Sequence, residues 1–156
     1  MIHYAKQDIS SDDIDAVVSV LRSDFLTQGP AVERFESGLT DATGAGHAIA
    51  CNSATSALTL GCTALGLSDG DILWTSPITF VASATCGLHC GASVDFIDIN
   101  PGTGNMSIEA LEAKLIESAK GKRLPKVLIV VHYAGQSSDM ERIWLLSLKY
   151  GFFIIE

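Results

Sequence analysis

The chain has 156 residues, of which 47% are hydrophobic, and its formal net charge at pH 7 is -8. This length fits one domain with a substantial core, and the negative charge argues against nucleic acid or an anionic membrane as a partner. No apolar run is long enough to cross a membrane, and the first residues lack the apolar core of a signal peptide, so we expect a cytoplasmic protein.

The four cysteines, at positions 51, 62, 86 and 90, lie among apolar or small residues. Cys86 and Cys90 are spaced so that they could share one face of a helix, with His89 between them. A zinc site would need two further ligands, and the sequence has no second pair with ligand spacing. We therefore expect buried, reduced thiols and no metal.

Two helices are expected at the start of the chain. Ser10–Asp13 reads as a capping box that opens the first helix, which should end near Ser23. Pro30 suits the first position of a second helix, which should stop at Gly44 or Gly46.

From His47 onward, apolar runs typical of strands alternate with segments that have helical spacing. The expected strands are 47–51, 72–74, 93–97, 127–131 and 152–155; the expected helices are 55–65, 80–90, one capped by Ser107, and 140–150, opened by a capping box at 138–141. This alternation predicts an α/β domain with a mainly parallel sheet and right-handed crossovers.

The segment Asn52–Leu58 joins the first of these strands to a helix. Its small residues leave backbone N–H groups accessible at the helix start, where the helix dipole also favours an anion such as phosphate. The alternative is an ordinary helix cap made by Asn52, Ser53 or Thr55 that binds nothing.

Ligands of open parallel sheets bind beyond the carboxyl ends of the strands, so residues that follow the strands are the other candidates. Phe80 could stack on a planar ring, although a role in the core is equally open. His132 and Gln136 follow the strand at 127–131, where Gly135 would permit a turn. Together these residues fit a planar phosphorylated cofactor.

Five segments, in this order and at this spacing, resemble the DegT/DnrJ/EryC1/StrS family of pyridoxal-phosphate (PLP) sugar aminotransferases. They are Asn52–Leu58, Thr75–Ala82, Val94–Asp98, Gly104–Asn105 and His132–Gln136. The opening segment Tyr4–Asp8 and the run Val20–Pro30 look most like the branch that aminates UDP-4-keto-6-deoxy-N-acetylhexosamines, as in pseudaminic acid synthesis. The resemblance covers essentially the whole chain.

The resemblance implies the large domain of a fold-type I PLP-dependent transferase, with L-glutamate as amino donor and active sites at the interface of a homodimer. It places Ala54 and Thr55 at the PLP phosphate and Phe80 on the pyridine ring, with Gln136 and His132 where the family lines the cofactor cavity. It also implies that residues 1–30 form an arm, a helix and a substrate loop, and that residues 31–156 form the front part of the PLP-binding domain. The residues that would bind the UDP-sugar are Tyr4, Thr27 and Gln28.

Two parts of the family's catalytic machinery have no counterpart in this sequence. The family places an aspartate for the pyridinium nitrogen directly after the strand that ends here at Glu156, and none of the six lysines lies in the family's Schiff-base motif. We therefore assign no catalytic residue, and we expect an N-terminal portion of a longer enzyme that is inactive alone.

Three other interpretations remain open. One is a different fold-type I PLP enzyme, such as a lyase or a desulfurase. Another is a short, non-catalytic relative that binds a ligand or dimerises. A dinucleotide-binding domain is the weakest, because the first strand is followed neither by a glycine-rich turn nor by an acidic residue about 20 positions further on.

Overall fold

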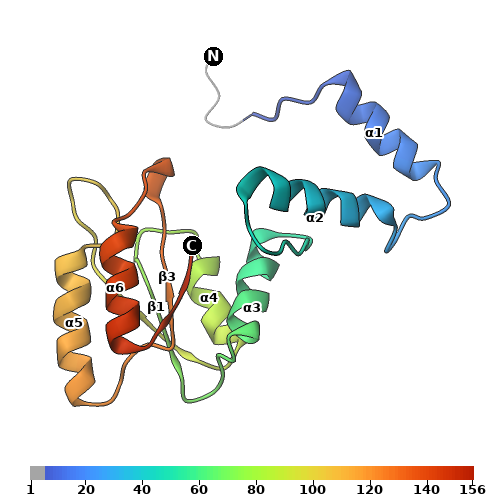
Figure 1. Cartoon of the computed structure of the whole chain (residues 1–156). Helices are drawn as coiled ribbons and strands as arrows, with labels where there is room; N and C mark the ends of the chain where they lie inside the picture. Colours follow the sequence, from blue (N-terminus) through green and yellow to red (C-terminus); the bar gives the residue numbers. More distant parts are fainter. Residues whose placement is uncertain (1–5) are drawn as a thin grey trace. The chain divides into compact units, whose positions relative to one another are not determined.

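The computed structural model describes residues 6–156 and divides the chain into two compact units. The first unit ends at Ala50, and the second is Cys51–Glu156. The first carries two helices and the second carries the whole sheet (Figure 1). The functional division expected after residue 30 stays a prediction.

Both helices of the first unit begin and end where the sequence signals predict. Helix α1 (Ser11–Leu21) starts at a capping box, in which Ser10 Oγ accepts the amide of Asp13 at 3.3 Å and the Asp13 carboxylate accepts the amide of Ser10 at 2.8 Å. Helix α2 (Pro30–Thr43) starts at Pro30 and ends at Gly44, whose left-handed φ of 71° suits glycine. Neither helix buries a side chain.

The strand expected at residues 47–51 is wrong. No strand forms there among the described residues, and the Ile49 side chain is 83% exposed. The amide of Ala50 donates to a carboxylate oxygen of Glu36 at 2.7 Å instead of to a neighbouring strand. A short apolar run becomes a strand only when another strand completes its hydrogen-bond ladder, and periodicity does not supply that partner.

The second unit contains a four-stranded parallel sheet with the order β2-β1-β3-β4. The strands are β1 (Ile72–Thr75), β2 (Ser93–Phe96), β3 (Val127–Ile129) and β4 (Phe153–Ile155). All four were predicted, with bounds shifted by one or two residues. The α/β class with a parallel sheet is confirmed.

Helices cover both faces of this sheet (Figure 1). Helices α3 (Ala54–Ala64) and α4 (Ala82–His89) lie on one face; α5 (Ile108–Lys120) and α6 (Met140–Tyr150) lie on the other. Side chains of a strand alternate between faces, so Leu73 packs with the α3 and α4 cluster, whereas Trp74 packs with the opposite one. Two separate cores result.

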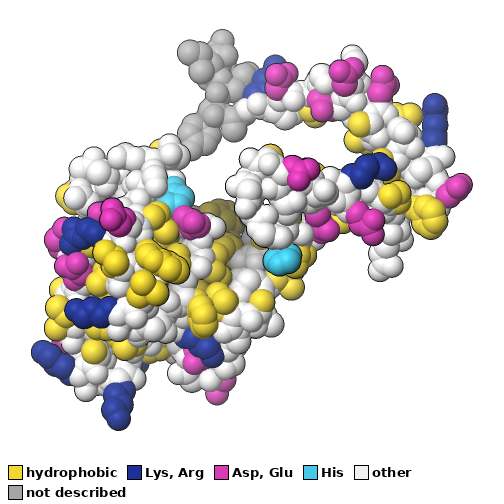
Figure 2. Space-filling model, viewed as in Figure 1, with side chains coloured by type: hydrophobic (Ala, Val, Ile, Leu, Met, Phe, Trp, Pro, Cys, Tyr) yellow, Lys and Arg dark blue, Asp and Glu magenta, His cyan; other side chains and the backbone are white. Residues whose placement is uncertain are grey.

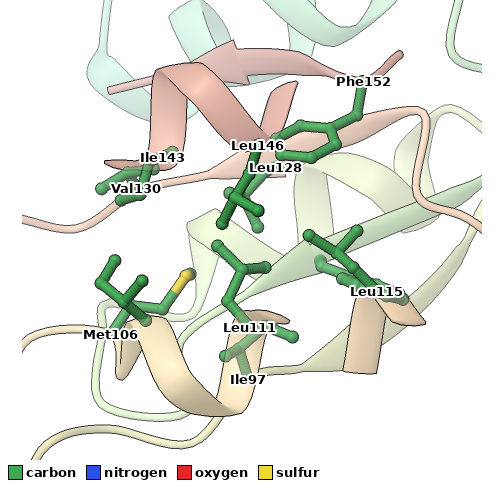
Figure 3. Close-up of a cluster of buried hydrophobic side chains, with 11 residues drawn as sticks. Ile97, Met106, Leu111, Leu115, Leu128, Val130, Ile143, Leu146 and Phe152 are labelled. Atoms are coloured by element: carbon green, nitrogen blue, oxygen red, sulfur yellow. The ribbon is translucent and has the colours of Figure 1, made fainter. Parts of the chain in front are cut away.

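The larger core joins α5 and α6 to the sheet. Figure 3 shows its side chains converging from α5, α6 and β3, and the fully buried residues include Leu111, Leu128 and Ile143. The helix predicted after Ser107 buries Ile108, Leu111 and Leu115. This core fixes the loops at the carboxyl ends of the strands, because the helices it holds begin there.

The smaller core joins α3 to α4 and contains two of the cysteines. Cys62 and Cys86 are buried, and the Cys62 thiol donates to the Cys86 sulfur across 3.9 Å. This hydrogen bond, together with burial, raises the pKa of Cys62. Cys90 is half-buried, but Cys51 is exposed, which corrects the expectation that all four thiols are buried.

The residue that caps the start of helix α6 differs from the predicted one. Asp139, not Ser138, caps it by accepting the amide of Arg142 at 3.1 Å. Ser138 is buried and donates its hydroxyl to the carbonyl of Val131 at 3.2 Å, so it is not available as a cap.

Hydrophobic side chains lie at the surface over α6 (Figure 2), and those exposed in this helix are Trp144, Leu145 and Leu148. Within residues 6–156, no helix has both the length and the apolar character that a membrane span needs.

Candidate functional site

The start of α3 presents two unsatisfied backbone donors. Ser53 caps the helix by accepting the amide of Ser56 at 3.1 Å, and Ser53 O accepts the amide of Ala57 at 3.0 Å. The N–H groups of Ala54 and Thr55 have no acceptor among the described residues. These are the two residues that the resemblance assigns to a phosphate, and the ordinary cap made by Ser53 leaves their N–H groups available to an anion.

The Thr55 side chain adds a third donor beside this helix start. Thr55 is exposed, and its hydroxyl makes no hydrogen bond to the described residues. It borders an open hollow of about 520 Å³ that runs along α3 toward α4. The hollow is lined by Asn52, Thr55, Ser56, Thr59, Leu60 and His89. Two free amides, a hydroxyl and the positive end of a helix dipole form an arrangement that fits a phosphate group.

Phe80 lies in the turn that leads from β1 into α4. Its side chain is 73% exposed, so the alternative role in the core is excluded for the described chain. Its carbonyl accepts the amide of Ser83 at 3.0 Å, which fixes the backbone while the ring stays free. An exposed aromatic ring beyond the carboxyl end of a strand is available to stack on a planar ligand.

Gln136 lies in the loop that follows β3 and contains the short helix η1 (Tyr133–Gly135). The residue is exposed, and its side chain has no hydrogen-bond partner among the described residues. Its backbone, in contrast, is held by the side chain of Asn105. The structure therefore offers a free amide on a fixed loop.

His132, also a candidate, has both ring nitrogens in use. Nδ1 accepts the amide of Ser138 at 3.1 Å, so the proton of the neutral ring lies on Nε2, which is 3.0 Å from Oε2 of Glu156. The imidazole connects the end of β3 to the end of β4 and to the start of α6. These contacts hold the imidazole in place, and the prediction that His132 lines the cofactor cavity stays a prediction.

The predicted substrate residues belong to the first unit. Thr27 and Gln28 lie in the exposed loop between α1 and α2, where Gln28 adopts a left-handed φ of 52°. Tyr4 lies outside the described residues. This loop belongs to the first unit, and the residues at the carboxyl edge of the sheet belong to the second. A substrate site formed by both stays a prediction.

Sequence reasoning gave no separate role to three residues near this edge. Thr75 is the last residue of β1 and Ser76 follows it, and their buried hydroxyls have no hydrogen-bond partner in residues 6–156. Asn105 is buried and contacts the loop of Gln136. The sequence motif Gly104–Asn105 carries no signal for this contact, because Asn105 lies 31 positions before Gln136.

No group of three or more histidine, cysteine or acidic side chains that could hold a metal ion occurs within residues 6–156.

The sequence matches the DegT/DnrJ/EryC1/StrS aminotransferase family over residues 7–156. It is 40% identical over all 156 residues to a UDP-4-amino-4,6-dideoxy-N-acetyl-beta-L-altrosamine transaminase of Campylobacter jejuni subsp. jejuni serotype O:23/36 (strain 81-176), and covers 40% of that protein. It is 37% identical over 148 residues to the spore coat polysaccharide biosynthesis protein SpsC of Bacillus subtilis (strain 168), covering 95% of this chain and 36% of SpsC.

Solved structures give the same result. PseC of Helicobacter pylori, an aminotransferase involved in the biosynthesis of pseudoaminic acid, superposes with a TM-score of 0.84 at 34% identity and covers 99% of this chain. The PLP-form of the Streptococcus pneumoniae sugar aminotransferase Spr1654 superposes with a TM-score of 0.85 at 31% identity over 97% of this chain. This chain covers 41% and 38% of those two chains. With the family matched over residues 7–156 and the fold shared, the chain belongs to the DegT/DnrJ/EryC1/StrS aminotransferase family.

Proposed function

We propose that this chain supplies the phosphate-binding and ring-stacking side of a PLP site in a sugar aminotransferase. The family uses PLP, and the chain spans about 40% of the length of the transaminases that it matches at 40% identity. The observation that carries the proposal is the start of α3, where the free N–H groups of Ala54 and Thr55 lie beside the free hydroxyl of Thr55.

Each residue has a distinct part in this proposal. The two amides, the hydroxyl and the helix dipole hold the phosphate, which anchors the cofactor without taking part in bond breaking. Phe80 restrains the ring by stacking on it, and the amide of Gln136 lines the cavity at the same edge of the sheet. The bound cofactor supplies the electron sink that amino-group transfer requires.

For the complete enzyme we propose transfer of an amino group from L-glutamate to C4 of a UDP-4-keto-6-deoxy-hexosamine. Support comes from the branch of the relatives, which includes the Campylobacter jejuni transaminase and PseC. Thr27, Gln28 and Tyr4 are the proposed contacts to the nucleotide sugar, and the cytoplasm is the proposed location.

We also propose that the 156-residue chain does not turn over substrate by itself. Two of its lysines are held in ion pairs: Lys126 with Asp71 at 2.9 Å, and Lys114 with Asp95 at 2.7 Å. Lys120 and Lys149 lie in the last turns of α5 and α6, at the amino edge of a parallel sheet and away from the candidate site. These positions do not suit the amine that the chemistry needs.

The proposal also includes a homodimer. Within the first unit, the apolar side chains of its two helices do not bury one another, so these helices present an apolar surface that a partner could cover. These side chains include Ile14, Val17, Leu21, Val32, Phe35 and Leu39. Sedimentation velocity should give twice the monomer mass of 16.5 kDa, and a monomer at all concentrations up to about 100 µM would contradict the dimer.

Binding and turnover should be measured together. The probe for binding is pyridoxamine phosphate, because its amine cannot form Schiff bases with exposed lysines as PLP would. We expect saturable binding by equilibrium dialysis, and no glutamate-dependent turnover when PLP and a UDP-4-keto-6-deoxy sugar are added. Absence of binding would refute the cofactor site, and turnover by the pure chain would refute the proposal that it is inactive alone.

A further inference from the structure

The loop that carries Gln136 makes few hydrogen bonds within itself. Two internal bonds close it: Gly135 N–H to His132 O at 3.1 Å, and Gln136 N–H to Tyr133 O at 3.0 Å. Ala134 adopts a left-handed φ of 52°, which is unfavourable for a residue with a Cβ atom. Such a conformation persists only when surrounding groups hold it.

Asn105, from the loop between β2 and α5, supplies contacts along most of this segment. Its Oδ1 accepts the amide of Tyr133 at 2.8 Å. Its Nδ2 donates to the carbonyl of Gln136 at 3.1 Å and to the carbonyl of Ser137 at 3.3 Å. One side chain thus satisfies a donor at the start of the loop and two acceptors at its end.

The position of Asn105 is itself fixed. The side chain is 6% exposed, and its carbonyl accepts the amide of Asn100 at 2.8 Å. The preceding Gly104 has a φ of 76°, and a Cβ atom there would lie 2.6 Å from Cδ1 of Tyr133. Only glycine allows the two loops to approach this closely.

The far end of the loop is held by a second set of contacts. The amide of Ser138 donates to Nδ1 of His132, and its hydroxyl donates to the carbonyl of Val131. Between the two sets, the side chain of Gln136 is exposed and makes no hydrogen bond to residues 6–156. The backbone is clamped while one polar side chain is left free, which is the arrangement expected of a group presented to a ligand.

We propose that Asn105 is a positioning residue that clamps the loop Tyr133–Ser137, so that the Gln136 amide is presented from a fixed backbone at the carboxyl edge of the sheet, where the proposed cofactor binds. Asn105 acts through the backbone of this loop and does not touch the cofactor. The inference rests on the proposed function for the identity of the ligand, but the clamp itself rests on the three hydrogen bonds alone.

The clamp is tested first in the unmodified chain by amide hydrogen exchange followed by NMR. The Tyr133 amide should exchange at least about tenfold more slowly than an unstructured peptide amide, although its residue is exposed. Exchange at the free-peptide rate would overturn the clamp. This measurement does not depend on whether any variant folds.

Asn105→Asp tests the role of the clamp. The replacement keeps the oxygen that accepts the Tyr133 amide but puts a carboxylate oxygen against the carbonyls of Gln136 and Ser137. We expect affinity for pyridoxamine phosphate to fall about tenfold and amide exchange in the loop to become faster. Asn100→Asp is the matched control, because the Asn100 side chain accepts the amide of Gly102 and makes no hydrogen bond to the loop within residues 6–156.

Gln136→Ala completes a double-mutant cycle. If Asn105 acts through Gln136, Asn105→Asp should change affinity less than about twofold when Gln136 is already alanine, yet still speed exchange in the loop. Independent effects of the two changes on affinity would overturn the positioning role while leaving the cofactor site intact. If the unmodified chain binds no pyridoxamine phosphate, the proposed function fails, and slow exchange of Tyr133 would then support the clamp alone.

Discussion

At the scale of single residues, Asp71 shows how local contacts change the pKa of a carboxyl group. Its carboxylate accepts hydrogen bonds from the Lys126 ammonium and from the Ser68 amide, both at 2.9 Å. The bond from Lys126 is the main cause that lowers the pKa of Asp71 below its usual value. Folding therefore favours the ionised form of this carboxyl group.

This shift has a defined sign in pH. Because the folded state lowers the pKa, the stabilisation is present above the ordinary aspartate pKa of about 4 and is lost as pH falls through the lower folded value. Urea unfolding between pH 7 and pH 3 should show a smaller loss of stability for Asp71→Asn than for the unmodified chain. Asp69→Asn is the control, and an equal change in both variants would contradict the assignment.

Leu111 is one of the fully buried residues of the larger core. It lies in α5 and packs against side chains of β3 and α6 (Figure 3). Leu111→Ala should lower the free energy of unfolding by about 3 kcal/mol, because it removes buried methyl groups and leaves a cavity. On the same helix, Ile116 is 53% exposed, so Ile116→Ala should cost less than about 1 kcal/mol. Similar costs in urea titrations would contradict the packing described.

At the scale of elements, much of the second unit could be predicted from sequence because its signals are local. The apolar strand β3 and the helix that starts after Ser107 lie where their hydrophobic spacing and cap place them. The strand expected at 47–51 failed because no other strand pairs with it, and pairing is not a local property. The role of Asn105 was missed for the same reason, since its partners lie 28 to 32 positions away.

The motif at the start of α6 allows two assignments of the residue that caps the helix. The motif Ser138–Glu141 predicts a capping box, whereas the structure gives the cap to Asp139. Asp139→Ala should therefore lower the free energy of unfolding by about 1 kcal/mol, as loss of a helix cap usually does. Glu141→Ala should have little effect, and the opposite order of the two variants in urea unfolding would restore the capping box.

At the scale of the whole chain, the sheet gathers the candidate residues at one edge, although they are distant in sequence. Phe80 precedes α4 and Gln136 follows β3, so both lie beyond the carboxyl ends of parallel strands, and Thr55 opens α3, whose other end leads into the start of β1. The strand–helix alternation predicted this for Phe80 and Gln136, whereas for Thr55 the prediction relied on the strand at 47–51 that does not form. The sequence could not show which donors stay free, and the unpaired amides of Ala54 and Thr55 became visible only in the structure.

The measurement that tests the central claim most directly is binding of pyridoxamine phosphate to Thr55→Val and to Thr63→Val, followed by the ³¹P NMR signal of the phosphate. Both changes remove one hydroxyl from α3, but Thr63 lies near the other end of the helix and donates to the carbonyl of Thr59 at 2.8 Å. A hydrogen bond to a charged group contributes about 1.5–3 kcal/mol, so Thr55→Val should weaken binding at least about tenfold. Thr63→Val should bind as the unmodified chain does; equal affinity of all three proteins would contradict a phosphate site at the start of α3.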